Sequence, residues 1–230
     1  MTSAPAQADD QVIGLPQAWQ AIKWNAPALL VMSVVLLAAV LPGVAAMVWF
    51  TPVGVALALL LGLTVWAGCV RTADLALQGG DATVLVLVRS IGQSASLGLR
   101  TAWPAAFAAT CFVTAWYGFT TTQNPWFLVP AAVAGSVTVV LAVAVPFALT
   151  LAAVTPLRGK RLWTLAIGLV ATHPTGALGV AAATALAMLC ATDVLFSLAL
   201  LAPGPIAILS ALVTRQACAR RGLTAAAWRE

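Results

Sequence analysis

Few residues of this sequence could carry out chemistry, and those few are far apart. The 230 residues include one histidine and six acidic residues, of which Asp9, Asp10 and Glu230 lie in the terminal tails. An active site needs titratable groups that converge in a pocket. No nucleotide-binding loop, zinc-protease motif or set of serine, histidine and aspartate can be assembled from these residues. We therefore expect no catalysis, no cofactor and no metal site.

Five polar positions remain as candidates because they border long apolar runs. Arg71 and Asp74 are one helical turn apart and could pair, although a solvated helix end is the simpler interpretation. Asp193 is the one acid near the interior of an apolar stretch, and we expect it at the outer edge. His173 precedes a proline, which is more typical of a helix start than of a proton relay. Arg100 directly precedes another apolar run.

The composition is that of an integral membrane protein. Hydrophobic residues make up 62% of the chain and charged residues 7%, and the mean hydropathy is +1.02. A soluble domain carries about 25% charged residues, so this chain cannot cover a water-facing surface. Its apolar runs are continuous rather than alternating, which favours helices over barrel strands. We expect an all-α, polytopic membrane helix bundle that forms one domain over residues 1–230.

Six apolar runs are long enough to cross a hydrocarbon core of about 30 Å as helices. Residues 1–10 are predicted to be a disordered tail. The turn between the fifth and sixth spans is left open, because Asp193 and the Pro203-Gly204-Pro205 stretch are both suitable. The predicted spans are residues 27–50, 53–70, 101–119, 126–153, 175–192 and 195–213.

Two or three short amphipathic helices are predicted to lie in the cytoplasmic membrane interface. The first occupies residues 12–24, the second follows Asp81 with its last face residue at Ala95, and the third lies in the stretch after Pro156. In the second, Asp81 is the expected N-cap, and Ser90 and Ser94 lie on the polar face opposite the apolar one. Each helix leads through a proline into a pair of spans, which suggests a three-unit internal repeat. Those prolines are Pro27, Pro104 and Pro174.

The distribution of charge predicts the orientation. With six spans and both termini in the cytoplasm, all eleven lysine and arginine residues fall in inside segments. The three outer loops then contain no cation, and Asp193 is their only charged residue. This is the arrangement that the positive-inside rule describes. The net charge of +5 is therefore an orientation signal, with contact to anionic lipid as a second use, and no nucleic-acid partner is expected.

The order of these features over residues 24–221 resembles the YesL-like family of bacterial membrane proteins. The first span contains Leu41-Pro42 near its end, and the second opens with Thr51-Pro52-Val53-Gly54-Val55-Ala56. A Gly79-Gly80-Asp81 turn precedes the second amphipathic helix, and Ala171-Thr172-His173-Pro174 leads into the fifth span. The resemblance implies a multi-pass protein of the bacterial cell membrane. It also implies an association with ATP-driven carbohydrate uptake systems, and it supplies no catalytic residues.

Two functions are consistent with these observations. The first is a non-catalytic auxiliary or scaffold protein of a carbohydrate uptake system, whose partners would be the bilayer and a membrane protein such as a sugar permease. Small residues at helical spacing, such as Ala131 and Gly135, allow the close helix contacts that such a role needs. The second is a small transporter that moves a small or apolar solute by itself.

Overall fold

The computed structural model describes residues 15–155, 157–172, 174–193 and 202–220. The predicted tail, residues 1–10, therefore lies outside the described residues, as does His173. The described part of the chain is all-helical, as the sequence predicts. Its elements are α1 (Leu15–Trp24), α2 (Ala26–Met47), α3 (Thr51–Leu77), α4 (Val84–Thr122), the 3-10 turn η1 (Pro125–Phe127), α5 (Leu128–Val154), α6 (Gly159–Thr172), α7 (Pro174–Asp193) and α9 (Pro203–Arg220).

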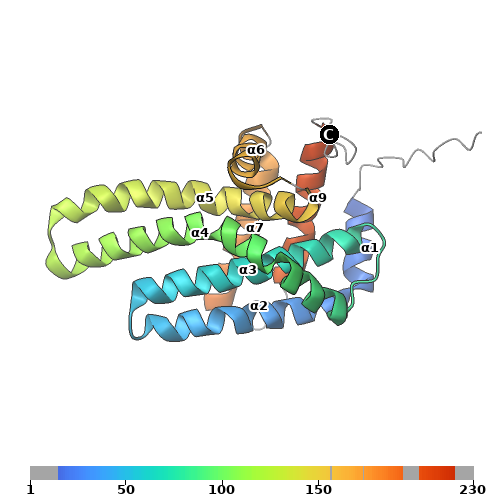
Figure 1. The fold of residues 1–230 in the computed structure, drawn as a ribbon, viewed down its shortest axis with the longest axis horizontal. Coiled ribbons are helices and arrows are strands. Elements are labelled where there is room, and N and C mark those ends of the chain that lie inside the picture. Colours follow the sequence, from blue (N-terminus) through green and yellow to red (C-terminus); the bar gives the residue numbers. More distant parts are fainter. Residues whose placement is uncertain (1–14, 156, 173, 194–201, 221–230) are drawn as a thin grey trace, which may run out of the picture.

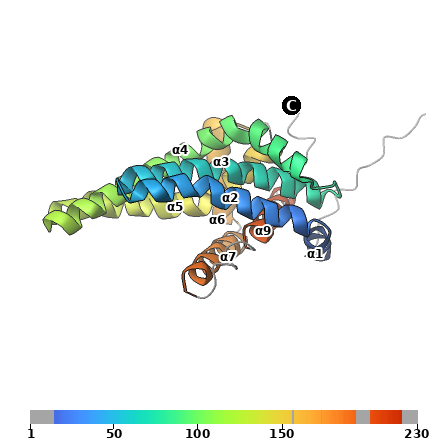
Figure 2. The ribbon, with the colours of Figure 1, turned by 90° about the horizontal axis from the view of Figure 1, so that it is seen from below.

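The four longest helices form two hairpins that lie side by side. Figure 1 shows α2 paired with α3 and α4 paired with α5, and all four helices lie lengthwise across the view, antiparallel within each pair. The tips of both hairpins, residues 48–50 and 123–127, lie at the same end of the molecule, and neither tip contains a charged residue. The α4–α5 hairpin extends further than the α2–α3 hairpin (Figures 1 and 2). Helices α7 and α9 run across this layer rather than along it.

Three helical segments among the described residues are long and apolar enough to cross a membrane. They are α2, α3 and the segment Pro125–Ala153, which combines η1 with most of α5. A fourth candidate is the pair of α6 and the first half of α7, which are inclined by 97° to each other. Helix α4, which contains the predicted span 101–119, is not among the candidates. The structure thus supports a helical membrane protein with three or four candidate spans.

Helix α4 corrects the prediction of a separate interfacial helix before the third span. Residues 84–122 form one helix of 39 residues, and Pro104 lies inside it rather than at the start of a new one. The N-cap is Thr83, whose Oγ1 accepts a hydrogen bond of 3.4 Å from Val86 N, so the expected cap at Asp81 is wrong. A proline removes one backbone donor but can be tolerated in a packed helix of a membrane protein. The second unit of the suggested repeat is therefore absent.

The face that α4 buries also differs from the prediction. Leu87 of the predicted apolar face is buried as expected, but Ser90 and Ser94 of the predicted polar face are buried too, whereas Val88 of the apolar face is exposed. Gly98 on the same side packs so closely against α3 that a Cβ there would come within 2.9 Å of Thr64 Cα. Small residues let membrane helices approach one another, which lets a serine stripe serve as a packing face instead of a water-facing one. The pattern of polar and apolar residues alone does not show whether a serine-rich face packs against another helix or faces water.

Helix ends elsewhere refine the predicted boundaries. Helices α2, α5, α6 and α7 overlap the stretches in which the sequence places helices. Helix α3 continues seven residues beyond the predicted end at Val70, to Leu77. In place of a span over 195–213, the structure begins α9 at Pro203, and residues 194–201 lie outside the described part. The Pro203-Gly204-Pro205 stretch is thus the first turn of a helix, not the loop that was one of the two alternatives.

Helix α9 contributes to two hydrophobic cores. The first core joins α9 to α2, α3 and the start of α4, and the second joins it to α5, α6 and α7. Residues of α9 in these cores are fully or almost fully buried. They are Ala207, Ile208, Ala211 and Leu212 in the first core and Ala217 in the second.

Candidate functional site

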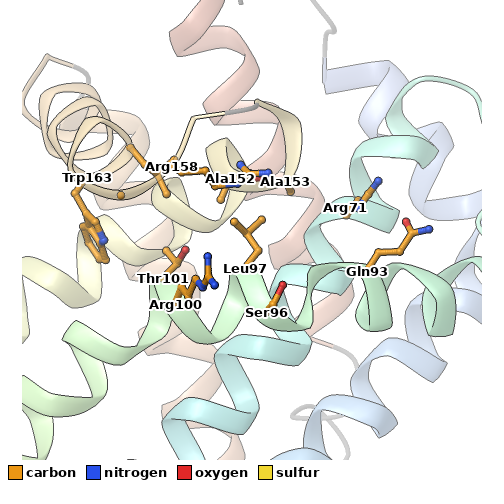
Figure 3. A pocket seen from close by; sticks show the side chains of 12 residues that line it. Arg71, Gln93, Ser96, Leu97, Arg100, Thr101, Ala152, Ala153, Arg158 and Trp163 are labelled. Atoms are coloured by element: carbon orange, nitrogen blue, oxygen red, sulfur yellow. The ribbon is translucent and has the colours of Figure 1, made fainter.

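A cavity of about 510 Å³ lies between α3, α4, the end of α5 and the start of α6. This volume falls within the range of roughly 300–1,000 Å³ that is usual for small-molecule sites. Figure 3 shows Arg71 and Gln93 at one end of the view and Trp163 at the other, with Arg100 and Leu97 rising from α4 between them. The cavity is lined by Arg71, Gln93, Ser96, Leu97, Arg100, Thr101, Ala152, Ala153, Arg158, Gly159, Leu162 and Trp163.

Three arginines from three parts of the chain line this cavity. Arg71 is on α3, Arg100 is on α4, and Arg158 directly precedes α6. Arg71 is half-buried and the other two are exposed. No described residue that lines the cavity is acidic. Two of the five candidate positions from the sequence, Arg71 and Arg100, thus meet in one site, and Arg158 joins them.

Hydrogen bonds to the end of α5 hold Arg158 in place. Its Nη1 donates to the carbonyl oxygens of Leu157 at 2.7 Å, Thr155 at 2.9 Å and Ala152 at 3.3 Å. The last carbonyls of a helix lack partners within the helix and carry partial negative charge, so they attract a guanidinium. Gly159 follows with φ of 62°, a left-handed conformation that suits glycine and starts α6 immediately after the arginine.

Asp74 does not pair with Arg71, although the sequence spacing suggests this pair. Its carboxylate instead accepts two hydrogen bonds from Arg215 of α9, from Nε to Oδ1 at 2.5 Å and from Nη2 to Oδ2 at 3.0 Å. Gln78 Nε2 donates a third at 2.8 Å. Asp74 is buried, so it needs a fixed cation to offset its desolvation. The solvated helix end favoured from the sequence is therefore wrong.

Asp193 and His173 do not enter this site. Asp193 is the last residue of α7, and its side chain lies outside the part of the structure that is described. His173 is not described at all. Within the described ranges, no group of three or more histidine, cysteine, aspartate or glutamate side chains is arranged to hold a metal ion.

Comparison of the chain with protein-family models, with curated proteins and with solved structures finds no match. What the site can bind therefore follows from the residues that line the cavity. Its cationic groups, its polar side chains Gln93, Ser96 and Thr101, and its apolar walls of Leu97, Leu162 and Trp163 suit an amphipathic anion better than a neutral sugar.

Proposed function

We propose that this protein is a multi-pass protein of the bacterial cell membrane with six spans and both termini in the cytoplasm. The support is the charge distribution, which leaves the tips of both long hairpins without a charged residue. Helices α7 and α9 lie across the other four in the structure, so the fifth and sixth spans are the part of this topology that needs the closest test. A map of single-cysteine accessibility provides it, because Asp193 in the predicted outer loop between these two spans should then be labelled from outside. We expect Thr121 to be labelled from outside and Arg89 from inside, and labelling of residue 121 from the cytoplasm would contradict the topology.

Its proposed role is that of a non-catalytic auxiliary or scaffold protein for another membrane protein. The observation that carries this role is the α4–α5 hairpin, which projects beyond α2 and α3 with its apolar side chains uncovered. Val133 on α5 is 62% exposed, and Tyr117 on α4 is 58% exposed. Lipid covers one such face, but a hairpin free on several sides also offers a surface for partner helices. The resemblance to the YesL-like family suggests that the partner belongs to a carbohydrate uptake system.

Site-specific photo-crosslinking tests this role. A photoreactive residue at position 133 should crosslink to a membrane protein in native membranes. The same residue at Val34 of α2, which is 55% exposed, is the matched control and should crosslink to lipid. Identification of a sugar permease or its binding protein by mass spectrometry supports the role. Crosslinks to lipid alone at both positions contradict it.

A second candidate is a small transporter that acts by itself, and the cavity between α3 and α6 is the observation that favours it. The purified protein in liposomes would then carry a solute across the bilayer without another protein. Measured flux that disappears in an Arg100→Gln variant supports transport. Flux no higher than that of empty liposomes contradicts transport by the protein alone and favours the auxiliary role.

A further inference from the structure

We propose that the cavity lined by Arg71, Arg100 and Arg158 binds the phosphate group of an organic phosphate ester. The ligand carries an apolar or extended portion as well as the anion. It is either a phospholipid, whose chains remain in the bilayer, or a soluble phosphorylated metabolite. This site does not depend on the auxiliary role, because the loss of a protein partner would leave the cavity and its charges unchanged.

The first observation is the lack of a counter-charge. Arg71 and Arg100 form no hydrogen bond or ion pair within the described part of the chain, and none of the described lining residues is an acid. Cations that surround a cavity repel one another, and a bound anion removes that repulsion. Guanidinium groups are also the side chains best suited to phosphate, because their fork of donors matches two of its oxygens.

The second observation is the placement of Arg158. All three hydrogen bonds that fix this side chain use Nη1 and bind backbone carbonyls of residues 152–157. Its Nε and Nη2 donors form no hydrogen bond with described residues, and no acid in the described ranges forms an ion pair with it. The side chain is therefore held at the rim of the cavity before any ligand arrives. Preorganisation of this kind lowers the entropy lost on binding.

The third observation is the character of the remaining walls. Leu97, Leu162 and Trp163 present apolar surface, whereas Gln93 and Ser96 present polar groups. A volume of about 510 Å³ is far more than a single inorganic phosphate fills. A phosphate ester places its anion against the arginines and its carbon skeleton against the leucines and the indole ring.

Binding to the full-length protein in neutral detergent tests the proposal. The probes are dioctanoyl phosphatidylglycerol and glycerol 3-phosphate, with dioctanoyl phosphatidylcholine as the zwitterionic control, and native mass spectrometry or calorimetry gives Kd. We expect at least one of the two anionic probes to bind. Arg100→Gln and Arg71→Gln should each weaken that binding about tenfold, the effect of losing one charge-assisted hydrogen bond. Arg100→Lys keeps the charge but loses the fork, so it should fall between the wild type and Arg100→Gln.

Arg89→Gln is the matched control, because Arg89 is also an exposed arginine of α4 but does not line the cavity. It should change Kd by less than about twofold. Binding of phosphatidylglycerol alone assigns the site to a lipid headgroup, and binding of glycerol 3-phosphate alone assigns it to a soluble ester. Two results overturn the proposal: neither anionic probe binds, or Arg89→Gln weakens binding as much as Arg100→Gln. The arginines would then serve only to orient the chain in the membrane.

Discussion

Arg215 and the three arginines of the cavity meet opposite electrostatic conditions. Arg215 reaches across from α9 to a buried carboxylate, and the pair is satisfied by two hydrogen bonds within the protein. Arg71 lies on α3, one helical turn from Asp74, yet it faces a cavity whose described lining residues include no acid. The ion pair of Arg215 therefore joins α9 to α3. The guanidinium of Arg71, in contrast, keeps its donors available for a ligand. Neighbouring positions on one helix can have structural and binding roles.

Removal of the carboxylate should produce the largest effect. Asp74→Ala leaves Arg215 without its partner and removes the ion pair between α9 and α3, so we expect a loss of about 2–3 kcal/mol in the free energy of unfolding. Unfolding in mixed micelles measures it. Asp81→Ala, which removes an exposed acid from the following turn, is the control. Equal losses in the two variants would show that the ion pair adds no stability.

A double variant separates the contribution of the Asp74–Arg215 charges to stability from that of side-chain packing at the same two positions. Asp74→Leu combined with Arg215→Met replaces the pair with apolar side chains, and we expect it to recover most of the stability that Asp74→Leu alone loses. If the double variant is no more stable than the single one, the two side chains act independently.

The spacing of α3 and α4 should affect the cavity more than it affects the ion pair. Gly98→Ala adds a methyl group within 2.9 Å of Thr64 Cα and 3.3 Å of Ala67 Cβ, so we expect a loss of about 1–3 kcal/mol and weaker binding of the phosphate probes. Gly92→Ala, on the same helix but with open space around its Cβ, should be neutral or slightly stabilising. Unchanged probe binding in Gly98→Ala would show that the cavity does not depend on this contact.

Loss of a cavity arginine should have the smallest effect on stability. Without a phosphate probe, Arg100→Gln should change the free energy of unfolding by less than about 0.5 kcal/mol, because no partner is left behind. With the probe that binds, the wild type should gain thermal stability and the variant should not. A large loss of stability without ligand would mean that Arg100 has a structural partner, and the contrast with Arg215 would disappear.

The sequence predicts the long helices well and the contacts between them poorly. Continuous apolar runs such as 27–50 and 126–153 allow few structures other than helices, and α2 and α5 lie within two or three residues of these ranges. The partner of Asp74 is different, because it lies 141 residues away. Local spacing can only suggest the neighbour at Arg71. The buried side of α4 is predicted only in part for a related reason, since Ser90 and Ser94 suit water and a close helix contact equally well.

The cavity was within reach of the sequence only in part. Arg71, Arg100 and Arg158 all fall in segments that the charge distribution assigns to one side of the membrane. That shared side is the signal that could have grouped them. The sequence does not reveal that α4 continues unbroken past Arg100, nor that the end of α5 holds Arg158. Both depend on how the helices pack.

The separation between Asp74 and Arg215 also sets an order in time. Arg215 is 141 positions after Asp74, so at about 5–20 residues per second it is added roughly 7–28 s later. During that interval the carboxylate is already on α3, while the guanidinium that will neutralise it does not yet exist. Burial of a carboxylate without a cationic partner carries a large desolvation cost. The Asp74 side chain can therefore reach its final hydrogen-bonded state only after α9 has been synthesised.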